Sequence, residues 1–203
     1  MTATLFYFHD PMCSWCWGYQ TAWQGLLQDM PDDVNVAYVL GGLAQDNDEL
    51  MPEDIQQAIQ GHWRRIQDEL GVEFNFDFWR YCQPRRSTYP ACRAVIAAGK
   101  QDAGVTMILA IQHAYYLRAM NPSKRDTLCT LAQELGLDIK KFNDDFDSDE
   151  IEESLQEQIR YSRSVGVGSF PSLMLKNKNE LYRLTVDYKN HETTLNQIID
   201  ILR

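Results

Sequence analysis

The stretch HDPMCSWCWG, residues 9–18, places Cys13 and Cys16 three positions apart, directly after an apolar run. That run, residues 4–9, is rich in aromatic residues and favours a strand. Beyond Cys16, apolar side chains recur every three or four positions, which predicts a helix over residues 14–29. We therefore expect the cysteine pair where a strand gives way to a helix, with Cys13 at the helix N-terminus.

A Cys-x-x-Cys pair in this position suits thiol–disulfide exchange. The attacking species is a thiolate, and the unpaired backbone N–H groups at a helix start favour an anion. Cys16 would then attack the mixed disulfide formed by Cys13 and release the product. A zinc site is the alternative, but it would need a second closely spaced pair of ligands, which Cys82, Cys92 and Cys129 do not form. We predict a redox pair, with no metal and no bound cofactor.

Length and charge narrow the range of functions. The chain has 203 residues, 44% of them hydrophobic, and a net charge of −10. The size suits one large domain or a small domain with an insertion. The negative charge argues against nucleic acid and anionic membranes as partners, and no segment approaches the roughly 18 apolar residues of a membrane span. With no basic N-terminal region typical of a signal peptide, we expect a cytoplasmic protein.

The predicted elements fall into three blocks. Residues 4–40 read as strand, helix and strand, residues 50–165 as a series of helices, and residues 172–202 as a hairpin followed by a helix. The two β blocks can join in one central sheet of about four strands. We therefore predict an α/β fold with one domain of residues 1–45 plus 165–203 and an inserted helical domain of residues 46–164.

These features resemble the thioredoxin fold in its DsbA-like form. The resemblance rests on the Cys-x-x-Cys, the helical insertion after the second strand, and the segment VGVGSFP before the hairpin. It is closer still to the cytoplasmic branch of predicted protein-disulfide isomerases, through DPMCSWCWG, GGL, HW and YPACRA, which begin at residues 10, 41, 62 and 89. The resemblance implies a thiol–disulfide oxidoreductase acting on disulfide- or thiol-containing proteins or on small thiols.

The resemblance also implies roles for individual residues. Cys13 matches the nucleophilic cysteine and Cys16 the resolving one, while Pro171 matches a cis-proline whose neighbouring backbone pairs with an extended substrate. The candidates for substrate binding are Phe170, Pro171, Trp15, Ser14 and His62. Strongly oxidising members carry His where this chain has Trp15, so oxidase, reductase and isomerase directions all stay open.

Several polar residues are weaker candidates. His9 could exchange protons near the pair, although the polar end of a strand is the simpler interpretation. Asp10 could help to deprotonate Cys16 if it is buried, and a turn residue is the alternative. Cys82 and Cys92 could form a loop disulfide or a second redox pair, but in a cytoplasmic protein we favour two free, partly buried thiols.

Arginines near these cysteines give a further anion-binding hypothesis. Arg85, Arg86 and Arg93 could bind a carboxylate of glutathione, a thiol co-substrate for such chemistry, but we favour solvated loop arginines.

Two other functions remain as alternatives. The kappa-class glutathione transferases and hydroxychromene-carboxylate isomerases resemble this fold too, but they usually carry Ser where this chain has Cys13 and lack the second cysteine. A redox-sensing or chaperone-like binder would instead use the helical domain and exposed tryptophans to hold clients. No coiled-coil seam marks a dimer interface, so the oligomeric state is open.

Overall fold

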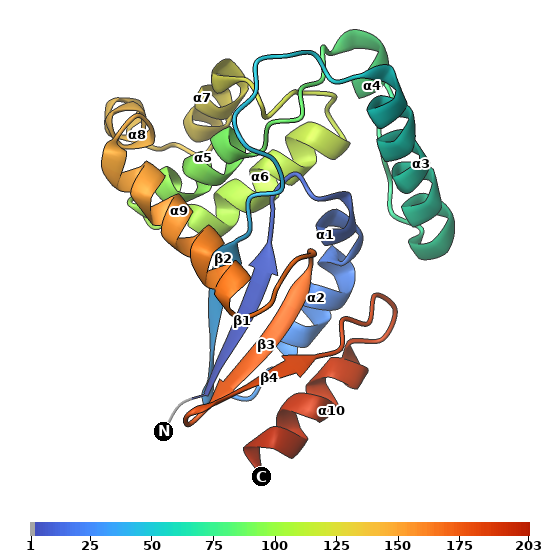
Figure 1. Ribbon diagram of the computed structural model, residues 1–203, viewed down its shortest axis with the longest axis vertical. Coiled ribbons are helices and arrows are strands. Elements are labelled where there is room, and N and C mark those ends of the chain that lie inside the picture. Colours follow the sequence, from blue (N-terminus) through green and yellow to red (C-terminus); the bar gives the residue numbers. More distant parts are fainter. Residues whose placement is uncertain (1–2) are drawn as a thin grey trace.

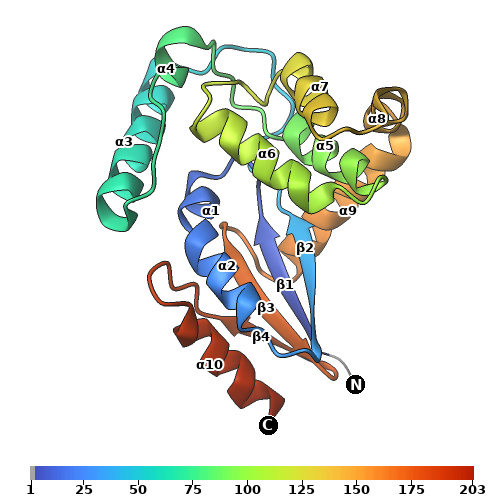
Figure 2. The ribbon, with the colours of Figure 1, turned by 180° about the vertical axis from the view of Figure 1, so that it is seen from behind.

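The computed structural model describes residues 3–203, and its helices gather mainly at one end of a sheet (Figures 1 and 2). The strands are β1 (Ala3–His9), β2 (Val34–Leu40), β3 (Ser172–Asn177) and β4 (Glu180–Leu184). The helices are α1 (Ser14–Gly18), α2 (Gln20–Gln28), α3 (Glu53–Leu70), α4 (Phe78–Tyr81), α5 (Tyr89–Gly99), α6 (Gly104–Tyr116), α7 (Arg125–Glu134), α8 (Ile139–Phe146), α9 (Asp149–Ser164) and α10 (His191–Leu202).

The described strands form one sheet in the order β2-β1-β3-β4. β1 runs parallel to β2, with Tyr7 opposite Tyr38, and antiparallel to β3, with Tyr7 opposite Leu173. β4 pairs with β3 as an antiparallel hairpin. The strand–helix–strand unit and the later hairpin therefore share one sheet, which confirms the predicted thioredoxin-like α/β fold.

Alternation along β1 gives the sheet two buried faces, because successive side chains of a strand point to opposite sides. Leu5 and Tyr7 pack with Trp23 of α2 and Ile198 of α10. Phe8 lies on the other face, in a cluster that includes Tyr161 of α9. In Figure 1, α2 and α10 accordingly cover one face and α9 the other. This burial fixes β1, and with it the loop that carries the cysteines.

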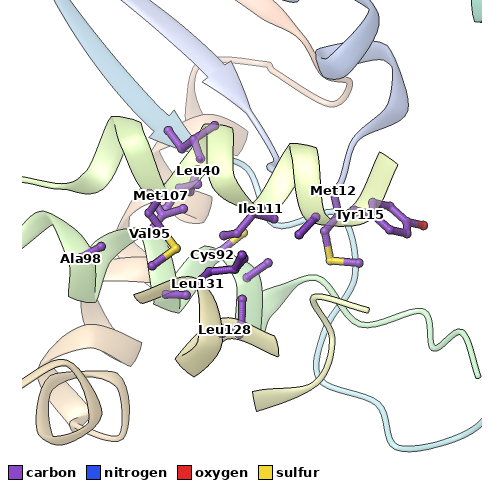
Figure 3. Packing of buried hydrophobic residues seen from close by; sticks show 14 of the residues in the cluster. Met12, Leu40, Cys92, Val95, Ala98, Met107, Ile111, Tyr115, Leu128 and Leu131 are labelled. Atoms are coloured by element: carbon purple, nitrogen blue, oxygen red, sulfur yellow. The ribbon is translucent and has the colours of Figure 1, made fainter. Parts of the chain in front are cut away.

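The helical block, α3 to α9, stands over the ends of β1 and β2 (Figure 1). Its core brings together apolar side chains of α5, α6 and α7, among them Val95, Ile111 and Leu128. Met12 of the cysteine loop and Leu40 at the end of β2 extend into the same core (Figure 3). The block is therefore packed directly onto the end of the sheet that carries the cysteine loop, and the exact division into two domains stays a prediction.

The predicted helix over residues 14–29 is instead two consecutive helices. Tyr19 separates α1 from α2, yet its side chain is fully buried and continues the apolar periodicity. Gly18, just before the break, lies so close to α3 that a Cβ there would be 2.9 Å from Cγ2 of Ile66. The spacing of apolar residues continues unchanged across Tyr19, so the sequence pattern did not reveal the break between the two helices.

No helix within residues 3–203 has both the length and the apolar character needed to cross a bilayer.

Candidate active site

Cys13 and Cys16 occupy the junction between β1 and the first helix. Cys13 is the N-cap residue of α1, with extended backbone angles, and Cys16 lies within the helix. Both are free thiols. Cys16 is completely buried, and burial, followed by its interaction with Cys13, raises the pKa of its thiol well above the ordinary value. Cys13 is also largely buried, but 6% of it is exposed and Cys16 has no exposed surface.

The segment before β3 faces Cys13. The Phe170–Pro171 peptide bond is cis, as the resemblance predicts. The thiol of Cys13 donates a hydrogen bond to the carbonyl oxygen of Phe170, with a sulfur–oxygen distance of 3.4 Å. Residues that are 157 positions apart in the chain are thereby joined at the sulfur of Cys13.

Glycine at the end of β2 makes room for this segment. A Cβ on Gly41 would lie 1.8 Å from Cζ of Phe170, so the ring is seated directly on the glycine backbone. Gly42 follows with a φ of +60°, in the left-handed region that favours glycine. Gly41 of the Gly-Gly pair identified in the sequence thus has a physical role in positioning Phe170, whereas Gly42 lies against Ile159 and Tyr89.

The two residues between the cysteines have different surroundings. The Ser14 hydroxyl accepts a hydrogen bond of 3.0 Å from the indole N–H of Trp63. Trp15 is half-buried, with Tyr188 at 5.4 Å against its ring edge and the Arg65 guanidinium 5.4 Å from its ring centre. Trp17, in contrast, belongs to the core of the helical block.

Asp10 is buried and links three segments. One carboxylate oxygen accepts a hydrogen bond from the Met12 N–H at 2.8 Å. The other accepts from the Leu43 N–H at 2.8 Å, the Thr88 hydroxyl at 2.7 Å and the Cys92 thiol at 3.7 Å. Burial raises the pKa of the Asp10 carboxyl, and these bonds partly offset the increase. The carboxylate therefore joins the cysteine loop to the helical block, and its role as a base toward Cys16 stays a prediction.

His9 is fully buried at the end of β1. Its ring stacks on Tyr7 at 5.1 Å, and neither ring nitrogen has a hydrogen-bond partner within the described part of the chain. Burial lowers the pKa of His9 to about 3. The side chain is consequently neutral near pH 7, and proton exchange with the cysteines remains a hypothesis.

A groove of about 540 Å³ opens beside Cys13. Its walls come from the start of α1, the first half of α3 and the loops before α5 and β3. Predicted site residues on its surface are Cys13, Ser14, Trp15, His62 and Phe170. The structure thus brings most of the predicted site residues to one cavity, while Cys16, His9 and Asp10 lie behind it.

The arginines divide between the groove and other surfaces. Arg85 and Arg86 line the groove, and Arg85 forms an ion pair of 2.6 Å with Asp48. Arg93 lies elsewhere, paired with Asp46 and Glu152. Our preference for solvated loop arginines therefore describes Arg93 poorly, since its side chain is mostly buried between two carboxylates, and only Arg85 and Arg86 remain candidates for binding an anion in the groove.

The remaining cysteines are free, as predicted for Cys82 and Cys92. The Cys82 thiol donates a hydrogen bond of 3.0 Å to the Ala119 carbonyl oxygen, and the Cys92 thiol donates one to the Asp10 carboxylate. Within residues 3–203, no group of three or more His, Cys, Asp and Glu side chains is arranged to hold a metal ion.

Sequence reasoning missed several residues that build the site. Trp63, Leu43 and Thr88 reach the cysteine loop from the helical block or the segment leading to it. The motifs around positions 41, 62 and 89 were visible in the sequence, but no local pattern could pair them with residues 10–14. Only the packing of the block onto the sheet brings them together.

This combination of a four-stranded sheet, a Cys-x-x-Cys at the first helix and an opposed cis-proline defines a thioredoxin-fold protein with a dithiol site. The family model for thioredoxin matches residues 6–194. The chain therefore belongs to the thioredoxin family.

Solved structures with a similar fold include DsbA-like proteins. A candidate protein disulfide isomerase from Nitrosomonas europaea is 26% identical, with a TM-score of 0.85, and the match covers 99% of this chain and 97% of that one. The cytosolic disulfide reductase DsbM from Pseudomonas aeruginosa is 22% identical, with a TM-score of 0.80 and 98% of each chain covered. The oxidoreductase DsbA from Xylella fastidiosa shares the fold at 16% identity, with a TM-score of 0.65 and coverage of 99% and 84%.

One relative is named as an adapter protein and not as an oxidoreductase. The chain is 24% identical over 196 residues to the ClpXP adapter protein SpxH of Halalkalibacterium halodurans. The match covers 92% of this chain and 64% of the relative, so the chain spans less than two thirds of that protein's length.

Proposed function

We propose that this protein is a thiol–disulfide oxidoreductase in which Cys13 attacks the substrate and Cys16 resolves the mixed disulfide. One observation carries this assignment: Cys13 lines the groove opposite Phe170, whereas Cys16 is completely buried behind it. A substrate sulfur entering the groove meets Cys13 first. Cys16 can then attack the sulfur of Cys13 within the mixed disulfide, so that the substrate sulfur leaves.

The proposed reaction balances without a cofactor. The Cys13 thiolate attacks one sulfur of a disulfide, a Cys13–substrate bond forms, and the other substrate sulfur leaves as a thiolate that takes a proton. Cys16 then loses its proton and attacks Cys13, which forms the Cys13–Cys16 disulfide and releases the second substrate thiolate. Two molecules of an external thiol restore the dithiol and are oxidised to one disulfide.

We further propose that the protein works as a reductase in the cytoplasm, with glutathione as the external thiol. Arg85 and Arg86 in the groove match the carboxylates of glutathione. Support also comes from DsbM, which is named a cytosolic disulfide reductase and has been solved with glutathione. Substrates would be disulfides of proteins or of small thiols, as for a protein-disulfide isomerase-like enzyme.

The test is steady-state reduction of hydroxyethyl disulfide by glutathione. We expect turnover by Cys13→Ser to be at least about 100-fold lower than by wild type, because the substitution removes the nucleophile. Equal turnover by wild type and Cys13→Ser would refute the proposal. Glutathione conjugation that persists in Cys16→Ala, with no disulfide turnover in wild type, would favour the transferase alternative.

A protein-binding function is the second candidate, favoured by the similarity to an adapter protein. Leu43 and Leu50, in the loop between β2 and α3, are both exposed, and Leu43 borders the groove. Suppression of client aggregation that is unchanged in a Cys13→Ser, Cys16→Ser protein would support it. Loss of that suppression in the double variant would contradict it.

A further inference from the structure

A buried tryptophan of the helical block makes a hydrogen bond to the residue between the two cysteines. Trp63 is fully buried in α3, and its indole nitrogen lies 3.0 Å from the Ser14 oxygen. Ser14 follows Cys13 directly and lines the same groove. The bond crosses 49 positions of sequence and connects the helical block to the Cys-x-x-Cys motif itself.

The indole is held in a single place by surrounding rings. Phe74 stacks on it at 5.0 Å, Trp79 meets it edge-on at 5.0 Å, and Tyr116 does so at 5.4 Å. Aromatic packing of this kind restricts rotation of the side chain. The direction of the indole N–H is therefore determined by the core of the block and not by the groove.

Accepting this bond leaves the Ser14 hydroxyl hydrogen available for another partner. A serine hydroxyl has one hydrogen to donate and two lone pairs to accept with. An oxygen that already accepts a hydrogen bond becomes a better donor, because bonded groups polarise one another. One group that can take this hydrogen is the buried Tyr116 hydroxyl, which interacts with Ser14 and has no other hydrogen-bond partner among the described residues. The other is the sulfur of Cys13, the preceding residue in the chain, once it is anionic.

We propose that Trp63 is a positioning residue for the exchange reaction: it orients the Ser14 hydroxyl so that this group donates a hydrogen bond to the anionic sulfur at Cys13. The inference rests on the proposed role of Cys13 as nucleophile. It reassigns the motif His62-Trp63, because His62 is exposed on the groove wall whereas Trp63 reaches the cysteine motif.

The test compares the reactivity of Cys13 in four variants. Trp63→Phe retains an aromatic ring without the N–H, Ser14→Ala removes the acceptor, the double variant removes both, and Ser14→Thr restores a hydroxyl. Trp23→Phe is the matched control, because it deletes an indole hydrogen bond of 3.2 Å to Tyr38 on the sheet side. Alkylation of Cys13 by iodoacetamide is followed by peptide mass spectrometry between about pH 6 and pH 9.

We expect Trp63→Phe and Ser14→Ala each to slow alkylation near pH 7 by about threefold to tenfold, the factor that one hydrogen bond supplies. The double variant should be no slower than the slower single variant, because both changes remove the same interaction. Ser14→Thr and Trp23→Phe should stay within about twofold of wild type.

Several results would overturn the inference. Alkylation of Trp63→Phe within about twofold of wild type would do so, as would losses that multiply in the double variant. If Trp63→Phe does not fold, the comparison of the two Ser14 variants still tests the inference. Equal alkylation rates for Ser14→Ala and Ser14→Thr would contradict a role for the hydroxyl. Alkylation needs no disulfide substrate, so a failure of the oxidoreductase proposal would be seen separately as missing turnover.

Discussion

At the scale of single residues, the site depends on polar groups that are buried at the end of β1. Asp10 satisfies donors from the cysteine loop, the Gly-Gly loop and α5. His9, its neighbour, is buried without partners for its ring nitrogens in the described residues. Burial thus acts on both pKa values, raising that of Asp10 and lowering that of His9.

These pKa shifts predict a pH dependence of stability. Because the pKa of His9 falls from 6.5 to about 3 on folding, the unfolded chain binds the extra proton below pH 6.5. The contribution of the buried, neutral His9 to folding stability is therefore fully present above pH 6.5 and is lost as the pH falls below it. We expect the free energy of unfolding to fall from pH 8 to pH 5 by about 2 kcal/mol less in His9→Phe than in wild type, as measured by urea unfolding at each pH.

The control for this experiment is His62→Asn, since His62 is exposed. It should retain the wild-type pH dependence. Asp10 acts in the opposite sense, because its raised pKa makes stability decrease as the pH rises through that value, so each variant is compared with wild type at the same pH. Parallel pH profiles for His9→Phe and wild type would contradict the role assigned to His9.

At the scale of elements, the end of β2 and the segment before β3 fit together through one glycine. Gly41 supports the Phe170 ring, and Phe170 in turn accepts the bond from Cys13. A short side chain at position 41, just after β2, would therefore act on the sulfur of Cys13 through the intervening ring.

We expect Gly41→Ala to destabilise the protein by about 1–3 kcal/mol, the usual cost of overpacking, and to slow disulfide exchange because Phe170 must move. Gly61→Ala in α3 is the matched control. A Cβ there meets nothing within 4 Å, so the change should stabilise the helix by about 0.5–1 kcal/mol. Thermal unfolding and turnover check both; unchanged values for Gly41→Ala would refute the proposed contact.

The sequence predicted the elements better than the contacts between them. The strand, the cysteine pair and the later hairpin follow from local periodicity and turn residues, and the cis-proline followed from family resemblance. The break at Tyr19 did not, because a buried tyrosine preserves the apolar pattern across it. The bond from Trp63 to Ser14 was also unpredictable, since it depends on how α3 packs beside α1.

At the scale of the whole molecule, the helical block, the cysteine loop with the start of α1, and the segment before β3 together form the groove beside Cys13. The protein carries a net charge of −10, yet two arginines line this cavity. Asp54 also lines the groove and Arg85 is paired with Asp48. Within the described residues, Arg86 is therefore the groove arginine without an ion pair, and its charge favours an anionic substrate at that place.

We therefore expect Arg86→Gln to raise the KM for glutathione by about threefold to tenfold with little change in kcat, because one charge-assisted contact is lost. Arg80→Gln is the control, since Arg80 is an exposed arginine outside this groove, paired with Asp77. Added salt should reduce the difference between wild type and Arg86→Gln. An unchanged KM in Arg86→Gln would contradict anion binding at this position.

The most direct test of the central claim is to trap the mixed disulfide. Reduced Cys16→Ser protein is exposed to oxidised glutathione, and peptide mass spectrometry locates the adduct. We predict one glutathione on Cys13, and in wild type no lasting adduct but a Cys13–Cys16 disulfide. An adduct on Cys82 or Cys129 in place of Cys13, or a stable adduct on Cys13 in wild type, would contradict the roles assigned to the pair.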